Sequence, residues 1–286
     1  MVDFLSSLPK KDPIKQDQLC HLSVPLLPKS HFYVKLLSFA LFHSSFLGCL
    51  PLLDSCGSCW AHAALSSLAD RIKIERMMPH HRSNNNTDQN NWNANGLYMN
   101  DINLSVQYVL NCGPSAKVGS CHGGNSLRTY KFIKHVSGMV PYDTCQPYIA
   151  CSAESQNGFC PNVDTTCNAM NTCRTCTRIQ ATPESPLEQK CQEITIFPNA
   201  TIDSYGTYSA DDYDHDTYIR AIQSEILIRG PVVTALNGHP LNEYSGGIYN
   251  NVTESKIHTH AVSIVGWGQD PVTNDQYWIV RNSWGG

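Results

Sequence analysis

The sequence predicts an α+β protein in which a helical half is followed by a strand-rich half. Between residues 60 and 140, apolar side chains recur at three- and four-residue spacing, which is typical of helices. After residue 194, short β-type runs alternate with turn residues. We therefore expect an N-terminal region over 1–55, a helical subdomain over 56–190 and a β-rich subdomain over 191–286.

The first predicted helix runs from Trp60 to Met77, without Gly or Pro, and Pro79 ends it. Helical spacing returns over residues 101–112 and again over 126–140. Residues 80–96 are rich in Asn and poor in aliphatic side chains, so we expect a solvated insertion there.

The helical subdomain ends with a segment over 143–191 that is rich in Cys, Thr and Asn, for which we expect loops joined by disulfides. A short amphipathic helix is predicted over 217–232, where Gly230 and Pro231 stop it. Four runs then favour strands, namely PVVTALN, GGIYNNV, HAVSIVGWG and QYWIVRNSW.

The cysteine content indicates an oxidising compartment. The chain has 286 residues and 13 cysteines, and reducing cytosol rarely keeps such a density as disulfides. The odd number leaves at least one thiol without a partner in the chain. The net charge is −4 and no run of Lys and Arg occurs, so we expect no nucleic-acid binding.

The N-terminal region is unusual. It lacks the features of a secretory signal, because Asp3 is acidic and Lys10 and Lys11 follow a very short apolar stretch. Residues 36–53 carry no formal charge, but His43, several serines and Pro51 make them a poor membrane span. Three interpretations stay open for this stretch: a membrane segment, a buried core segment, or an aberrant insertion, which we favour.

The motif DSCGSCW raises the question whether Cys56 and Cys59 form a metal clip, a redox pair, or one bridge and one nucleophile. Cys59 lies where a helix is predicted to begin, and a helix N-terminus stabilises a thiolate. His260 begins a predicted strand that would hold an imidazole rigidly, and Asn282 follows the next strand as an acceptor for its other nitrogen. Trp284 lies beside Asn282 as an apolar cover.

Four motifs in this order, CGSCWAH, SCHGGN, HAVSIVGWG and YWIVRNSWG, resemble the papain family of cysteine peptidases, and most closely its cathepsin X (cathepsin Z) type. The resemblance implies a papain-like fold of two subdomains and a cysteine-type peptidase, with carboxypeptidase action. It makes Cys59 the nucleophile, His260 the general base and Asn282 the group that orients the imidazole. Gly123 and Gly124 would pair with the substrate backbone, and Trp284 would shield the Asn–His bond.

The resemblance also implies a disulfide pattern in which Cys56 is a bridge. The implied pairs are Cys56–Cys121, Cys112–Cys167, Cys145–Cys173 and Cys176–Cys191, while Cys151 and Cys160 would close an extra loop. A zinc site formed by CGSC and CRTC is a weaker alternative, as is a thioredoxin-like redox pair, because no βαβ unit precedes the motif.

The sequence departs from the family in three places. The family's oxyanion glutamine would stand at Leu53 or Leu50, neither of which donates a hydrogen bond. The loop histidine that binds a substrate carboxylate is absent near residue 51, within an apolar stretch (31–55) that we attribute to a mis-spliced transcript or gene model. We expect the β-rich subdomain to be incomplete after Gly286, since the family continues with further strands.

These observations define the expected properties of the chain. We expect no cofactor and no metal, peptide or protein substrates, inhibitors of cystatin type, a monomer that does not enter membranes, and a lysosomal or extracellular location. Asn85 and Asn199 begin sequons in solvated segments and are the expected glycosylation sites. The alternative function is that of a non-catalytic fragment or peptide-binding relic of such a peptidase, which lacks the oxyanion glutamine.

Overall fold

The computed structural model describes residues 19–22, 32–37, 56–77, 102–178, 189–250 and 258–284, the first two ranges by their backbone alone. The predicted Asn-rich insertion, Asn85, Leu50 and Leu53 lie outside these residues. No helix within the described ranges combines the length and the apolar character needed to cross a membrane.

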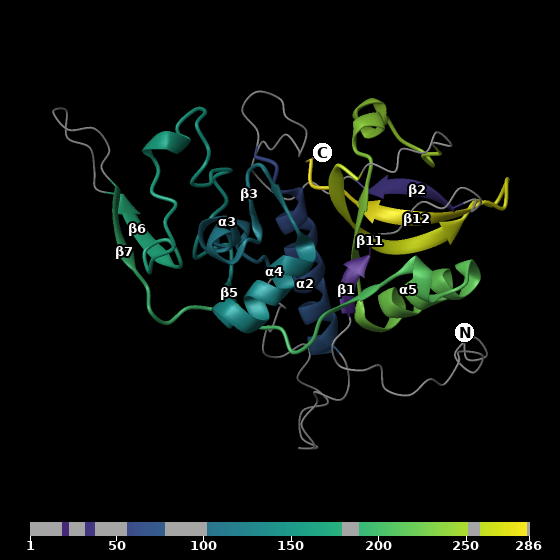
Figure 1. Ribbon diagram of the computed structural model, residues 1–286, viewed down its shortest axis with the longest axis horizontal. Helices are drawn as coiled ribbons and strands as arrows, with labels where there is room; N and C mark the ends of the chain where they lie inside the picture. Colours follow the sequence, from purple (N-terminus) through teal and green to yellow (C-terminus); the bar gives the residue numbers. More distant parts are fainter. Residues whose placement is uncertain are drawn as a thin grey trace, which may run out of the picture.

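Helix α2 (Cys59–Met77) runs between a helical part and a β-sheet (Figure 1). It begins one residue before the predicted start, because the carbonyl oxygen of Ser58 accepts the N–H groups of Ala61 and His62 at 2.9 and 3.1 Å. Small and apolar side chains along α2, from Trp60 to Ala69, are buried in the core of the helical part. This helix therefore links the two predicted halves.

The helical part also contains α3 (Val106–Cys112) and α4 (Ser126–Phe132). The predicted helix over 101–112 begins only at Val106, because the side chain of Ser105 caps it by accepting the N–H of Tyr108. The predicted helix over 126–140 is shorter than expected. After α4 it continues as one π-helical segment (Ile133–Ser137) and ends at Gly138, whose φ of +74° suits glycine.

A six-stranded sheet has the strand order β2-β12-β11-β10-β1-β9. Strands β10, β11 and β12 are antiparallel neighbours, whereas β1 and β2 run parallel to the strands they pair with. The bounds are β1 (Leu19–Leu22), β2 (Phe32–Leu37), β9 (Gly206–Tyr208), β10 (Val232–Leu236), β11 (His260–Gln269) and β12 (Gln276–Arg281). Two strands from the predicted N-terminal region thus join the β-rich half.

Helix α5 (His215–Arg229) covers this sheet in Figure 1 and matches the predicted helix over 217–232. Its buried residues pack with alternate side chains of β10, β11 and β12 into a second core. The prediction of a strand at GGIYNNV was wrong for its described part, since residues 246–250 form no strand of the sheet. Gly246 and Gly247 have φ values of +141° and +84°, which do not fit an extended strand.

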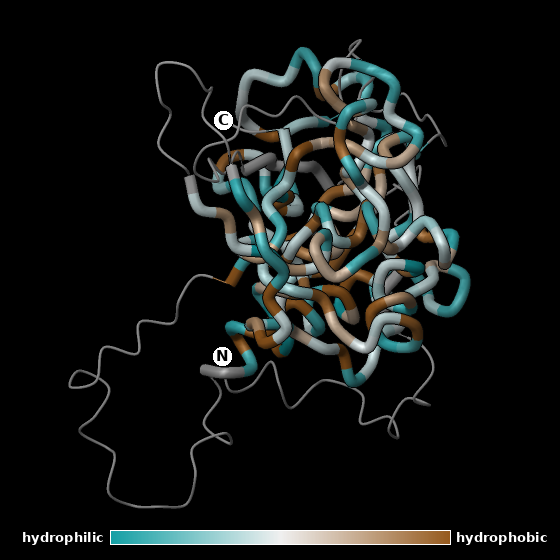
Figure 2. The backbone as a smooth tube through the Cα atoms, turned by 90° about the vertical axis from the view of Figure 1, so that its left-hand side faces the viewer, coloured by the Kyte–Doolittle hydropathy of each residue, from teal (hydrophilic) through white to brown (hydrophobic). Residues whose placement is uncertain are grey.

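The cysteine-rich segment is mostly loop, as predicted, but it contains one hairpin of β6 (Arg174–Arg178) and β7 (Gln189–Glu193). The expected boundary at residues 190 and 191 falls inside β7. The described residues contain two more antiparallel strand pairs besides this hairpin. In one, β3 (Gly119–Ser120) pairs with β4 (Gly123–Gly124), and in the other, β5 (Val140–Pro141) pairs with β8 (Asn199–Ala200). Figure 2 shows hydrophobic segments within the body of the molecule, consistent with the two cores.

Candidate active site

Cys59 is the first residue of α2, and its side chain is buried. The backbone N–H of Ala261 donates to its Sγ atom at 3.5 Å, so the helix and strand β11 meet at the thiol. The N-terminus of a 19-residue helix places partial positive charge beside the sulfur. The helix N-terminus therefore favours negative charge at this position.

His260 is the residue next to Ala261 and begins β11. Its Nε2 atom lies 2.7 Å from Oδ1 of Asn282. Because an amide oxygen only accepts, Nε2 carries the proton, and the basic nitrogen of the neutral ring is Nδ1. The Nδ1 atom is buried and has no hydrogen-bond partner among the described residues. The ring is thus held in the tautomer that leaves Nδ1 ready to take a proton.

The imidazole is enclosed on two sides. The indole ring of Trp284 lies 4.8 Å from the ring of His260, at an interplanar angle of 37°. On the backbone side, a Cβ atom at Gly238 would come within 2.7 Å of the Cβ of His260, so only glycine leaves room there. Trp284 therefore packs against the imidazole of His260.

Gly123 and Gly124 form the exposed strand β4 beside the N-terminus of α2. A Cβ atom at Gly124 would overlap the indole ring of Trp60, the residue after Cys59. The space around Gly123 is open, since a Cβ atom there would meet nothing within 4 Å. The backbone N–H of Gly57 donates to the carbonyl oxygen of Cys121 at 2.7 Å, which ties this loop to the cysteine motif.

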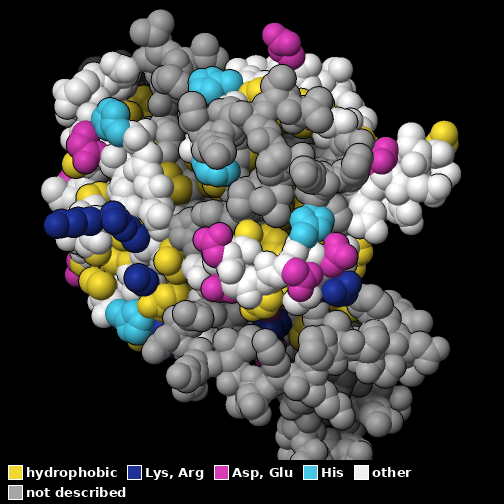
Figure 3. All heavy atoms as spheres, turned by 45° about the vertical axis from the view of Figure 1, so that its right-hand side comes forward, with side chains coloured by type: hydrophobic (Ala, Val, Ile, Leu, Met, Phe, Trp, Pro, Cys, Tyr) yellow, Lys and Arg dark blue, Asp and Glu magenta, His cyan; other side chains and the backbone are white. Residues whose placement is uncertain are grey.

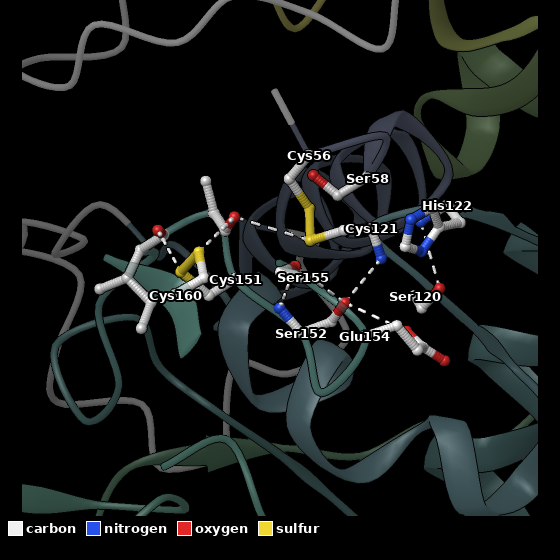
Figure 4. Close-up of a disulfide and its surroundings, with 12 residues drawn as sticks. Cys56, Ser58, Ser120, Cys121, His122, Cys151, Ser152, Glu154, Ser155 and Cys160 are labelled. Atoms are coloured by element: carbon white, nitrogen blue, oxygen red, sulfur yellow. Dashed lines mark hydrogen bonds between the residues drawn. A yellow bond between two sulfur atoms is a disulfide. The ribbon is translucent and has the colours of Figure 1, made fainter. Parts of the chain in front are cut away.

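Five disulfides are present among the described residues, of which four join the pairs that the resemblance implies and the fifth closes the extra loop. They are Cys56–Cys121, Cys112–Cys167, Cys145–Cys173, Cys151–Cys160 and Cys176–Cys191. Figure 4 shows the first of them beside Ser58, with Cys151–Cys160 nearby. Cys59 takes part in none of these bonds, whereas Cys56, Cys173 and Cys176 are all consumed by them. The alternative of a zinc site formed by CGSC and CRTC is therefore wrong, because three of its four cysteines are in disulfides.

Two ionic contacts that the sequence did not reveal connect α2 with the β-rich half. Asp70 accepts a hydrogen bond from Arg281 at 2.6 Å, next to Asn282. Arg71 contacts the buried carboxylate of Glu225 in α5 at 2.7 Å. Each pair is more than 150 residues apart in the chain, so no local pattern could have paired them.

A buried hydroxyl contact lies between these ion pairs and the thiol. Ser67 of α2 donates to the Oγ of Ser263 in β11 at 3.0 Å, and Ser263 donates to the carbonyl oxygen of Ala63 at 3.2 Å. Together with the ion pairs, it fixes the position of the helix carrying Cys59 relative to the strands carrying His260 and Asn282.

The remaining predicted site residues lie at the surface or outside the described ranges. Asn199 is exposed in the short strand β8, and its amide nitrogen donates to the carbonyl oxygen of Phe197 at 3.1 Å. On the face drawn in Figure 3, acidic, basic and histidine side chains are scattered among uncharged ones.

Comparisons with known proteins give one matching family model and several related sequences. A family model described as papain family cysteine protease matches residues 52–286. Cathepsin Z of Onchocerca volvulus is 31% identical over 233 residues, which cover 80% of this chain and 58% of that protein. Cathepsin B-like cysteine proteinase 1 of Haemonchus contortus is 26% identical over 238 residues, with the same coverage. The chain thus spans less than two thirds of the length of these relatives.

Among solved structures, the SERA5 proenzyme from Plasmodium falciparum matches over 80% of this chain and 52% of the SERA5 chain. The two share 20% sequence identity, with a TM-score of 0.45.

Proposed function

The chain belongs to the papain family of cysteine proteases, and we propose that it hydrolyses peptide bonds with Cys59 as nucleophile, His260 as general base and Asn282 as the orienting residue. One observation carries this proposal. The Sγ atom of Cys59 accepts the backbone N–H of Ala261, the residue next to His260, and Nε2 of His260 lies 2.7 Å from Oδ1 of Asn282.

The proposed reaction has two halves. The thiolate of Cys59 attacks the carbonyl carbon, and the imidazolium of His260 donates its Nδ1 proton to the leaving amine, which breaks the peptide bond. Water then attacks the thioester carbonyl while Nδ1 accepts one of its protons, and the C–S bond breaks, which releases the acid and restores the thiolate–imidazolium pair. Asn282 keeps the ring in one orientation through both halves because Nε2–H donates to it throughout.

We further propose that an extended substrate pairs with the backbone of Gly123 and Gly124. Both residues are exposed in β4, and the open space around Gly123 lets another chain approach closely. Carboxypeptidase action of cathepsin X type is the preferred specificity. It rests on the relationship to cathepsin Z rather than on a described carboxylate-binding group.

An active-site label tests the nucleophile. We expect a peptide epoxide or vinyl sulfone to label the folded chain, and Cys59→Ala to abolish the labelling. His260→Ala should reduce it strongly, whereas His239→Ala, at an exposed histidine, should not. Labelling that persists in Cys59→Ala would contradict the assignment.

Hydrolysis of matched peptides tests the specificity. A carboxypeptidase releases the last residue of a peptide with a free C-terminus and is much slower on the corresponding amide. Equal rates on the two peptides, or cleavage at internal bonds, would identify an endopeptidase instead.

A second candidate is a peptide-binding protein without turnover. It is favoured by the sequence near the motif, LPLLDSCGSCW, which contains no glutamine to stabilise an oxyanion. Loss of one such donor typically lowers the rate by roughly 10²- to 10³-fold. A chain that binds peptides and reacts with the label, yet releases no product, would support this candidate.

The wider setting is also a proposal. Five disulfides persist best in an oxidising compartment, so we propose a lysosomal or extracellular location. We propose peptide or protein substrates, cystatin-type inhibitors and a monomeric state, with subdomains over 56–190 and 191–286. Asn199, which is exposed, is a proposed glycan carrier, and Asn85 remains a prediction from its sequon.

A further inference from the structure

We propose that Tyr148 is a positioning residue of the active site, because it holds the hydroxyl of Ser58 away from the helix N-terminus that carries Cys59. The inference rests on the proposed peptidase function. Ser58 immediately precedes the nucleophile and is 1% exposed. Its Oγ atom lies 2.6 Å from the hydroxyl oxygen of Tyr148, 90 residues away in the chain.

Ser58 occupies the N-cap position of α2 but does not act as a usual cap. A serine there normally uses Oγ to accept an N–H group from the first turn of the helix. In this structure, Oγ of Ser58 contacts Tyr148 at 2.6 Å, and the N–H groups of Ala61 and His62 donate to the backbone carbonyl oxygen of Ser58 at 2.9 and 3.1 Å. The side chain is engaged with Tyr148, so it does not neutralise the positive end of the helix.

Tyr148 is held firmly enough to do this. It lies between Cys145 and Cys151, both of which are in disulfides. The N–H of Ile149, the next residue, donates to the buried amide of Gln107 at 3.1 Å. The ring of His62 stands edge-on to the tyrosine ring, with centroids 4.7 Å apart and an angle of 84°. The phenol therefore approaches Ser58 from a fixed direction.

The consequence concerns the transition state of peptide hydrolysis. Negative charge develops on the substrate oxygen, and the N-terminus of α2 carries partial positive charge beside Cys59. If Ser58 turned its hydroxyl oxygen toward the first-turn N–H groups, that oxygen would compete with the oxyanion. Tyr148 prevents this competition without touching the substrate.

The test compares Tyr148→Phe, Ser58→Ala and the double variant. We expect Tyr148→Phe to lower kcat by roughly tenfold with KM within about twofold, since part of the oxyanion stabilisation is lost. Alkylation of Cys59 by iodoacetamide creates no oxyanion, so its rate should change far less. In the double variant, kcat should return to that of Ser58→Ala, because the competing hydroxyl is gone.

A readout that needs no turnover separates this inference from the proposed function. In Tyr148→Phe, amide hydrogen exchange measured by NMR should slow at Trp60 or Ala61, because the serine hydroxyl now caps the first turn. If the wild-type chain hydrolyses no peptide, the proposed function is wrong. The exchange measurement would still show whether Tyr148 keeps the hydroxyl of Ser58 away from the first turn of α2. Unchanged exchange in the folded variant, or a loss of kcat that Ser58→Ala does not relieve, would overturn it.

Discussion

The Oδ1 atom of Asn282 accepts a hydrogen bond from Nε2 of His260 at 2.7 Å, and the same oxygen accepts the backbone N–H of Ser283 at 2.8 Å. The second bond fixes the amide, so the first fixes the imidazole. The tautomer of His260 is therefore set by the backbone that follows β12, and it leaves Nδ1 as the basic nitrogen.

Replacing Asn282 by Ala should lower kcat by about 10- to 100-fold. The buried Nε2–H of His260 then lacks its acceptor, and such a loss costs ~1–3 kcal/mol. Steady-state hydrolysis of a peptide substrate measures the effect. Asn162→Ala is the matched control, at an exposed asparagine of the 3-10 helix Cys160–Asn162, and should keep full activity. An unchanged kcat in Asn282→Ala would show that the imidazole needs no such orientation.

Replacing Glu225 by Gln should lower the free energy of unfolding by about 3–5 kcal/mol, because two guanidinium groups lose the buried carboxylate that balances their charge. The carboxylate receives Arg71 at 2.7 Å and Arg229 at 2.6 Å. Burial alone would raise the pKa of Glu225, but these two arginines hold it below its ordinary value. Urea denaturation measures the loss.

The matched control for this variant is Glu243→Gln, at an exposed glutamate, which should change stability by less than about 0.5 kcal/mol. Because the pKa of Glu225 is lowered in the folded chain, its stabilisation is present at neutral pH and is lost as the pH falls through that lowered value. The difference between wild type and Glu225→Gln should therefore shrink in acid. A constant difference would contradict the ion-pair interpretation.

The half-buried ring of His62 should make the fold less stable as the pH falls from 6.5 toward 4. Burial lowers the pKa of His62 to about 4, so in this window the unfolded chain binds more protons than the folded chain. The resulting loss is at most ~3 kcal/mol. His62→Phe keeps an aromatic edge against Tyr148 and should show a smaller pH dependence in urea denaturation. An equal pH dependence in the two proteins would exclude His62 as its source.

Replacing Gly124 by Ala should destabilise the fold by about 1–3 kcal/mol, because the added methyl group overlaps the ring of Trp60. Since Trp60 follows Cys59 directly, peptide hydrolysis should fall as well. Thermal unfolding and hydrolysis are the measurements. Gly266→Ala provides the control, since its Cβ would lie at an ordinary 3.6 Å from Ile279. Equal stability of the two variants would argue against the packing role of Gly124.

The sequence by itself determined the central helix, the strands at HAVSIVGWG and QYWIVRNSW, and the candidate residues Cys59, His260 and Asn282. These features depend on periodicity and on short motifs, which are local in the chain. Local patterns also explain two errors. The predicted helix over 126–140 was too long because a π-helical turn and Gly138 interrupt it, and GGIYNNV was mistaken for a strand despite its paired glycines.

Only the tertiary structure decided which distant groups meet. The contact of Ser58 with Tyr148, the ion pair of Arg71 with Glu225 and the bond of Ser67 with Ser263 join residues 90, 154 and 196 positions apart. No periodicity records such contacts, because each depends on how α2 packs between the disulfide-linked loops and the sheet. From the sequence alone, a serine before a helix is expected to cap it with its side chain. Only the packed structure shows that the hydroxyl of Ser58 contacts Tyr148.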